Sequence, residues 1–195
     1  MDKVQLEKSD ALLVLDVQND FLPGGALAVR DGDEVVPILN EYIALFVAQG
    51  LPVYATRDWH PSNHCSFTER GGPWPPHCIA GTAGAGFPPT LNLPKNAIVV
   101  SKAMDPDKEA YSGFDHSDLA EQLQRAGIRR VFIGGLTTDY CVRESVRDAL
   151  AQGFQVELLV DATRAINVHP GDGPAAIREM TERGAVPIEF DNVLP

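Results

Sequence analysis

Four reactive side chains of this 195-residue chain stand at or just beyond the ends of short apolar segments. Asp16 closes the first segment, Asp58 and Lys102 follow the second and third, and Cys141 follows the fourth after a Gly–Gly pair. The carboxyl ends of parallel strands share one edge of a sheet, where α/β proteins bind their ligands. If the segments are parallel strands, this edge carries two carboxylates, an ammonium and a thiol, which together can support nucleophilic catalysis.

Cys141 falls in the first turn of a predicted helix, and this position suits a nucleophile. The partial positive charge and free N–H groups of a helix N-terminus favour a thiolate and can stabilise an oxyanion. Lys102 nearby would lower the pKa of the thiol further, and Asp16 could accept its proton. The alternative interpretation is a small core residue, because free cysteines are among the most buried residue types.

A second group of residues has the types and spacing of a metal site. In Asp58-Trp59-His60 the carboxylate and the imidazole are two residues apart, so on an extended segment they lie on one face. His77, in the motif WPPHC, could add a second imidazole. One carboxylate and two imidazoles suit a divalent ion such as Zn, Fe or Mn and leave coordination positions open for water or substrate.

A structural zinc site is the competing interpretation of the same segment. Its ligands would be the two His-Cys pairs His64-Cys65 and His77-Cys78. Neighbouring side chains point apart, and the C-x₂-C spacing of structural zinc sites is missing. This geometry makes the pairs an awkward ligand set.

The elements that must position these residues alternate in type along the chain. Short apolar runs predict strands at 11–17, 52–56, 97–101, 131–134, 156–160 and 186–190. Apolar residues at helical spacing, with capping residues at the ends, predict helices at 34–49, 115–126, 139–152 and 174–183. This alternation predicts an α/β fold: a three-layer α/β/α, doubly wound, Rossmann-like sandwich around a six-stranded, mostly parallel sheet.

The length fits a single domain over residues 1–195. The segment at about 57–96 interrupts the alternation, because it has no convincing periodicity of either kind. A loop this long inside a compact domain is usually functional or disordered. Its tryptophans and histidines favour an ordered, functional insertion that carries the metal site.

Charge and composition exclude several classes of partner. Sixteen Lys and Arg against 27 Asp and Glu give a net charge of −11, so polyanions such as nucleic acids and anionic membranes are not expected partners. No apolar run approaches the roughly 18–20 residues of a membrane span, and the first residues lack the layout of a secretion signal. A cytoplasmic location is therefore expected, and three cysteines in that reducing compartment are not expected to form a disulfide framework.

Five segments of the chain resemble, in order, the signature segments of the nicotinamidases, also called pyrazinamidases. These enzymes are metal-dependent members of the isochorismatase-like cysteine hydrolases. The matching segments are ALLVLDVQNDFLPGGALAV, TRDWHPSNHCSF, GGPWPPHCIAGTAGAGF, SKAMDPDKEAYSGF and GGLTTDYCVRESVRDAL. The resemblance extends from about residue 10 to about residue 190, and it implies hydrolysis of nicotinamide to nicotinate and ammonia.

The resemblance also implies roles for individual residues. The positions that match the family's catalytic triad are Asp16, Lys102 and Cys141. The positions that match its metal ligands are Asp58, His60 and His77. Some relatives have a further ligand, for which His64 and Glu69 are the candidates in this chain. One divalent ion is therefore expected, and Zn, Fe and Mn all stay open.

Other matching positions concern the substrate. Phe21, Trp74 and Tyr111 match aromatic positions that enclose the pyridine ring. The Leu136–Thr137 bond matches a cis peptide, which in the family orients the N–H of Thr137 beside that of Cys141 as an oxyanion hole. The expected partner is the small-molecule substrate nicotinamide, with pyrazinamide as a second substrate and a homo-oligomer possible.

Other functions of the same superfamily stay open at this point. The nearest alternative is an amidohydrolase for another small amide, such as an N-carbamoyl or maleamate-like substrate, whose relatives usually lack the metal. An isochorismate-type vinyl-ether hydrolase is disfavoured by Cys141, because many of those enzymes lack the thiol. A binding module on the same fold would require a broken triad, since fold alone does not determine function.

Overall fold

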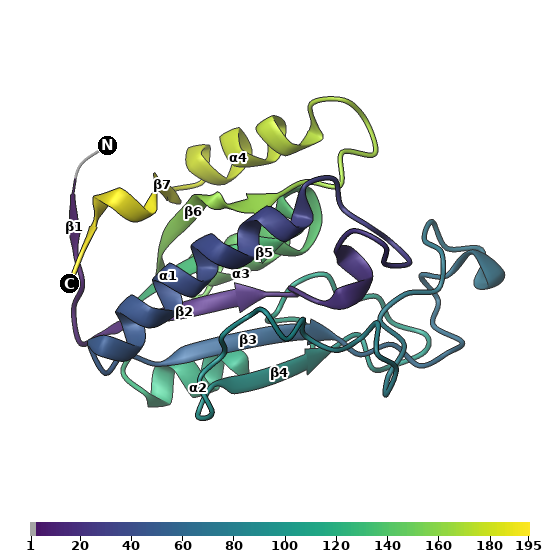
Figure 1. Ribbon diagram of the computed structural model, residues 1–195, viewed down its shortest axis with the longest axis horizontal. Coiled ribbons are helices and arrows are strands. Elements are labelled where there is room, and N and C mark those ends of the chain that lie inside the picture. The colour runs from purple at the N-terminus through teal and green to yellow at the C-terminus, as the bar shows by residue number, and fades with distance from the viewer. Residues whose placement is uncertain (1–2) are drawn as a thin grey trace.

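A six-stranded parallel sheet organises the protein in the computed structural model, which describes residues 3–195 (Figure 1). The strand order is β4-β3-β2-β5-β6-β7, and every neighbouring pair is parallel. The strands are β2 (Asp10–Leu15), β3 (Val53–Asp58), β4 (Ile98–Lys102), β5 (Arg130–Leu136), β6 (Gln155–Arg164) and β7 (Val186–Ile188). The predicted α/β fold is confirmed, and the sheet is parallel throughout.

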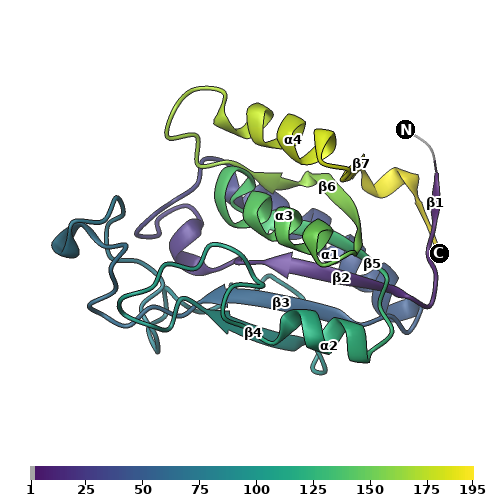
Figure 2. The same cartoon turned by 180° about the vertical axis from the view of Figure 1, so that it is seen from behind.

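Helices cover both faces of this sheet. The first face is covered by α1 (Val35–Ala48), in front of the sheet in Figure 1. The opposite face, toward the viewer in Figure 2, carries α2 (Leu119–Arg125), α3 (Arg143–Ala151) and α4 (Asp172–Glu182). The described part of the chain has no helix long and apolar enough to cross a membrane.

The apolar run of β2 explains why the strand lies at the centre. Leu12 and Val14 pack into the core under α1, whereas Leu13 and Leu15 pack into the core under the other helices. All four side chains are fully buried. A strand buried on both faces needs a continuous apolar sequence, which is the pattern of central strands in parallel sheets.

Two of the predicted helices differ at their N-terminal ends from what the sequence pattern predicts. The first, expected over 115–126, begins only at Leu119, because the Ser117 hydroxyl donates to the Gly113 carbonyl and accepts the Leu119 N–H. Such side-chain bonds compete with helical hydrogen bonds. The second, expected over 139–152, opens with a π-helical turn at Thr138–Val142 before α3. Single π-helical turns are frequent at functional sites.

A small parallel pairing at the chain ends has no signal in the sequence. Strand β1 (Val4–Gln5) pairs with β8 (Val193–Leu194), with each strand two residues long. Segments this short show no periodicity. The last predicted strand is also shorter than expected, because the chain turns at Phe190–Asn192, where the Phe190 N–H donates to Asp161 at 2.8 Å.

A buried ionic cluster lies near the amino-terminal ends of β2, β5 and β6. Arg130 binds the carboxylate of Asp10 through two nitrogens, at 2.9 and 2.6 Å, and reaches Glu157 at 3.7 Å. Within residues 3–195, the second carboxylate oxygen of Glu157 has no hydrogen-bond partner. Burial and the nearby Asp10 raise the pKa of Glu157, although the positive charge of Arg130 opposes them.

We therefore expect Glu157→Gln to stabilise the protein at pH 7. Because the pKa of Glu157 is higher in the folded than in the unfolded protein, the folded state binds the proton more tightly. The stability that Glu157 contributes is fully present at a pH below its pKa in the unfolded protein. This contribution is lost as the pH rises through its pKa in the folded protein. The amide keeps an acceptor for Arg130 without the buried charge.

The expected gain at pH 7 is about 1 kcal/mol, or roughly 2–4 °C in Tm. Thermal unfolding of both proteins between pH 4 and 8 tests it, and the gain should shrink toward pH 4, where wild-type Glu157 is protonated. The exposed Glu182→Gln serves as a matched control with no expected effect. A Tm difference that is constant with pH would contradict the explanation.

Candidate active site

The four reactive side chains identified in the sequence lie together at the carboxyl edge of the sheet. Asp58 and Lys102 are paired residues at the ends of β3 and β4. Asp16 directly follows β2, and Cys141 lies in the π-helical turn after β5. The ammonium of Lys102 is 3.0 Å from Asp16 Oδ2 and 3.5 Å from Cys141 Sγ. All four residues are buried, with at most 5% of their surface exposed.

The hydrogen bonds of Lys102 leave one nearby carboxylate oxygen, Asp16 Oδ2, with an ion pair only. Its ammonium donates to Asp58 Oδ1, to the Ala110 carbonyl at 3.1 Å and to Cys141 Sγ, which uses its three N–H donors. Asp16 Oδ1 accepts the Thr56 hydroxyl at 2.7 Å. Among the described residues, Asp16 Oδ2 has an ion-pair neighbour but no aligned hydrogen bond. This oxygen is therefore available to receive a proton.

The pKa values of the two carboxylates in the cluster are shifted in opposite directions. Burial raises the pKa of Asp16, and Asp58 raises it further, although Lys102 opposes both. Burial also works to raise the pKa of Asp58, but Lys102 and His60 outweigh it and hold this pKa well below its usual range. Asp58 is therefore the permanent anion of the pair, and Asp16 is the stronger proton acceptor.

The thiol of Cys141 differs from the expectation of a lowered pKa. Burial raises its pKa well above the ordinary value, and Asp16 and Asp58 add to the rise, while Lys102 lowers it only in part. Burial is therefore the largest effect on this pKa, and the single ammonium of Lys102 offsets only part of it. The resting group is the thiol, so a nearby base must remove its proton when it reacts.

The turn that carries Cys141 depends on a close approach of two strands. Gly135 has a φ of +123°, and a Cβ atom there would lie 2.1 Å from the Leu15 carbonyl oxygen. Only glycine fits this position. The Leu136–Thr137 peptide is cis, as the resemblance implies, and Thr137 and Cys141 line the same pocket.

Asp58, His60 and His77 form a compact group of possible metal ligands. Their ligand atoms all lie within 4.8 Å of one another, and all three residues are buried. The Nδ1 of His77 is 2.8 Å from the Pro75 carbonyl, which leaves its Nε2 for a ligand. Within the described chain, Nδ1 of His60 is buried without a hydrogen-bond partner. Burial lowers the pKa of His77, so its imidazole is neutral, as a metal ligand must be.

Neither of the two further ligand candidates belongs to this compact group of ligand atoms. Both ring nitrogens of His64 are engaged, one with the Ser66 hydroxyl at 2.7 Å and one with the Lys108 carbonyl at 3.0 Å. Glu69 is exposed in the turn Thr68–Arg70. The two His-Cys pairs do not form a ligand group in the described residues either. The thiol of Cys78 is buried, which raises its pKa far above the ordinary value.

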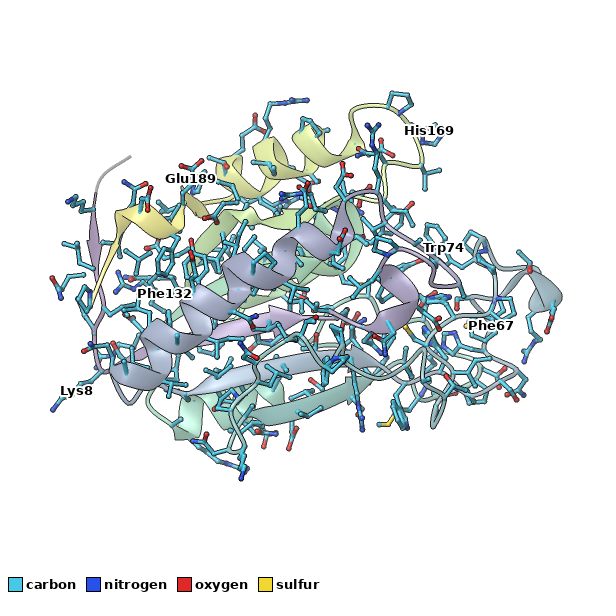
Figure 3. All side chains as sticks on the ribbon, viewed as in Figure 1. Lys8, Phe67, Trp74, Phe132, His169 and Glu189 are labelled. Atoms are coloured by element: carbon cyan, nitrogen blue, oxygen red, sulfur yellow. The ribbon has the colours of Figure 1, made fainter. Side chains whose placement is uncertain are left out.

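A pocket opens above this cluster at the end of the molecule where Figure 3 labels Trp74. Its walls include the three predicted aromatic residues, Phe21, Trp74 and Tyr111. The indole N–H of Trp74 donates to the Tyr111 hydroxyl at 3.0 Å. The ring centroids of Phe21 and His77 are 5.5 Å apart. The sequence did not indicate Ser66, Glu109 or Ile166, which also line the pocket.

Gln18 and Asp20, which lie just after β2, hold the long segment between β3 and β4 in place. Gln18 accepts the Asp58 N–H at 2.7 Å and donates to the carbonyls of Asp58 and Ala85 at 2.8 and 2.9 Å. Asp20 accepts the N–H of Cys78 at 2.7 Å. A polar run immediately after a buried strand was the only available signal for these residues.

The fold and the site thus define an α/β protein with a buried thiol–carboxylate–ammonium cluster and a candidate metal centre at the carboxyl edge of a parallel sheet. The chain belongs to the isochorismatase family, because the isochorismatase domain matches residues 10–191. This match covers all six strands of the sheet and every residue of the cluster.

Individual relatives are similar over almost the full chain. A nicotinamidase of Escherichia coli K12 is 37% identical over 196 residues, covering 90% of this chain and 92% of that protein. The structure of a pyrazinamidase of Pyrococcus horikoshii in complex with zinc is 52% identical, with a TM-score of 0.90 and coverage of 93% and 99%. PnC1 from L. infantum in complex with nicotinate is 36% identical, with a TM-score of 0.90 and coverage of 98% of both chains.

Proposed function

We propose that this protein hydrolyses nicotinamide to nicotinate and ammonia through a thioester on Cys141. The observation that carries the proposal is the position of the Cys141 thiol beside Lys102 and Asp16, at a pocket that also holds Asp58, His60 and His77. The nicotinamidase and pyrazinamidase relatives support this choice of substrate.

Asp16 moves the protons of the reaction. Its Oδ2 accepts the thiol proton as Sγ forms a bond to the carboxamide carbon. The same proton passes to the amide nitrogen as the C–N bond breaks, and ammonia leaves. Asp16 next takes a proton from water, whose oxygen attacks the thioester. The C–S bond breaks, nicotinate forms, and the thiol regains its proton. The raised pKa of Asp16 suits both directions of transfer.

Lys102 and the nucleophile turn stabilise the charges that develop. The Lys102 ammonium lies 3.5 Å from Sγ, so it stabilises the thiolate as it forms. The main-chain N–H groups of Thr137 and Cys141 are the proposed oxyanion hole. Loss of one such donor typically raises the barrier by about 3–4 kcal/mol.

Asp58, His60 and His77 would hold one divalent ion. The Nε2 of His60, which lies 3.7 Å from Asp58 Oδ2, the free Nε2 of His77 and the permanent anion Asp58 fit such an ion, because ligand atoms about 2.0–2.2 Å from a tetrahedral metal lie roughly 3.4 Å apart. When bound, the ion supplies Lewis acidity that can orient a pyridine through its ring nitrogen. The donor set suits Zn, Fe or Mn, and the zinc of the P. horikoshii relative favours zinc.

The aromatic walls suit the flat ring of the substrate. Phe21, Trp74 and Tyr111 present apolar ring surface to the pocket, which favours a planar aromatic ligand over a flexible acyclic one. Pyrazinamide keeps both the ring nitrogen and the carboxamide, so it is the proposed second substrate.

Turnover assays on the metal-loaded protein test the proposed function. Ammonia and nicotinate are measured with nicotinamide, and ammonia with pyrazinamide, maleamate and an N-carbamoyl amino acid. The proposal expects the two aromatic amides to be hydrolysed with the higher kcat/KM. A preference for an acyclic amide would overturn it in favour of the related amidohydrolase function.

Gln18→Leu is expected to weaken metal binding, although it replaces none of the three proposed ligands. The substitution removes all three hydrogen bonds that fix the main chain of Asp58 and the segment near Ala85. Loss of groups that orient metal ligands typically costs about 10–100-fold in affinity. Zinc titration calorimetry measures the change, with the exposed Gln124→Leu as a matched control. Equal zinc affinity in both variants would contradict this role of Gln18.

A further inference from the structure

The carboxylate of Asp139 accepts two main-chain hydrogen bonds that the proposed reaction does not require. Asp139 lies two residues before Cys141 in the π-helical turn and is 2% exposed. Its Oδ1 accepts the N–H of Ile166 at 3.0 Å, and its Oδ2 accepts the N–H of Asn167 at 2.8 Å. A buried carboxylate thus links the nucleophile turn to the segment that follows β6.

That segment reaches the pocket, and its other hydrogen bonds run to the start of α4: the His169 N–H donates to Asp172 at 2.8 Å. It joins β6 to α4 at the end of the molecule that also carries Trp74, and Figure 3 labels His169 within it. Ile166 lines the pocket, whereas residues 167–171 are exposed. Segments with few buried contacts open at low free-energy cost unless hydrogen bonds hold them. The two bonds to Asp139 hold the segment at the residue that meets the pocket.

A second attachment fixes the other side of the segment. Asn167 has a φ of +53°, and its side chain accepts the N–H of Gly173 at 2.9 Å. A Cβ atom on Gly173 would lie 2.6 Å from the Cβ of Ala165. Substitution of Gly173 would therefore displace the segment at Ala165, the residue before Ile166.

We propose that Asp139 is a positioning residue that holds Ile166 against the bound substrate. It acts on substrate binding through Ile166 and does not take part in the chemical step. An amide at this position could accept only one of the two N–H groups well, because its nitrogen is a donor. The identity of the substrate in this inference rests on the proposed function.

Asp139→Asn is the primary test. We expect KM for nicotinamide to rise about tenfold, which corresponds to the loss of about one charge-assisted hydrogen bond, while kcat stays within about threefold. Amide hydrogen exchange at residues 165–169 should be about tenfold faster. Asp161→Asn is the matched control, because Asp161 also accepts a main-chain N–H at 2.8 Å but does not line the pocket. It should change neither kinetic constant.

A double-mutant cycle tests whether Asp139 acts through Ile166. Ile166→Ala alone should raise KM, and adding Asp139→Asn to it should raise KM by less than about twofold more. Additive effects on KM, or a fall in kcat alone, would overturn the inference. If Asp139→Asn does not fold, Gly173→Ala displaces the same segment and should also raise KM with kcat retained; an unchanged KM would overturn the inference.

Binding of pyridine-3-carboxaldehyde separates this inference from the proposed function. If the wild-type protein does not turn over nicotinamide, the proposed function fails. Weaker aldehyde binding together with faster exchange in Asp139→Asn would still support the positioning role. Unchanged exchange at residues 165–169 would overturn that role whether or not nicotinamide is a substrate.

Discussion

Cys141→Ala is expected to reduce nicotinamide turnover by about 10⁴–10⁶-fold, the range for removal of a covalent nucleophile. Among the described residues that line the pocket, Cys141 alone carries a thiol, and its sulfur contacts the Lys102 ammonium. Without the sulfur, Asp16 has no nucleophile to deprotonate except water, and no thioester can form. Ammonia release over hours, at enzyme concentrations high enough to detect rare turnovers, measures the loss.

The loss must be separated from unfolding and from impurities. The side chain of Cys141 is small, so its truncation to alanine should cost only about 1 kcal/mol of stability. The Tm and the zinc content should therefore stay close to those of the wild type. Cys65→Ala is the matched control, because Cys65 is only partly buried and does not line the pocket. Turnover above about 1% of wild type in Cys141→Ala would remove Cys141 as the nucleophile.

The fold could be predicted because its signals are local. The run ALLVL in β2 is apolar at every position, and the structure buries it on both faces. Glycines that follow helices, such as Gly127 and Gly153, adopt positive φ angles and mark helix ends that the sequence indicated. The late start of α2 was not predictable in this way, because it depends on the hydroxyl of Ser117.

The meeting of the reactive residues could also be predicted, since it follows from topology alone. Once β2 to β5 are parallel neighbours, the residues at their carboxyl ends must share an edge. The protonation state of the Cys141 thiol could not be predicted from the sequence, because its pKa depends on complete burial beside two carboxylates. Spacing along the chain contains no information on desolvation.

The residues that order the metal-bearing segment depend on contacts between distant parts of the chain. Gln18 and Asp58 are 40 residues apart, and Asp20 and Cys78 are 58 apart. Polar residues after a strand indicate a functional edge but not their partners. The cytoplasmic location, the single-domain organisation and a homo-oligomer stay predictions.

His77→Ala is expected to abolish stable metal binding and, with it, substrate binding. His77 supplies one of two imidazoles in the candidate metal group, and a carboxylate with a single imidazole is a weak site for Zn. We expect zinc affinity to fall by more than the roughly 100-fold upper range for groups that only orient ligands. KM for nicotinamide should rise at least as much, because the aromatic walls alone must then orient the ring.

Metal analysis of the purified variant, zinc titration and steady-state kinetics measure these effects together. The wild type should hold about one zinc per chain, lose activity on treatment with a chelator and regain it when zinc is added. His116→Asn is the matched control, because His116 is exposed, does not line the pocket and has a φ of +51°, which asparagine tolerates. Zinc content that is the same in His77→Ala as in wild type would exclude His77 as a ligand. Loss of zinc with an unchanged KM would keep the metal centre but separate it from substrate binding, because the pyridine ring would then be held by Phe21, Trp74 and Tyr111 without the ion.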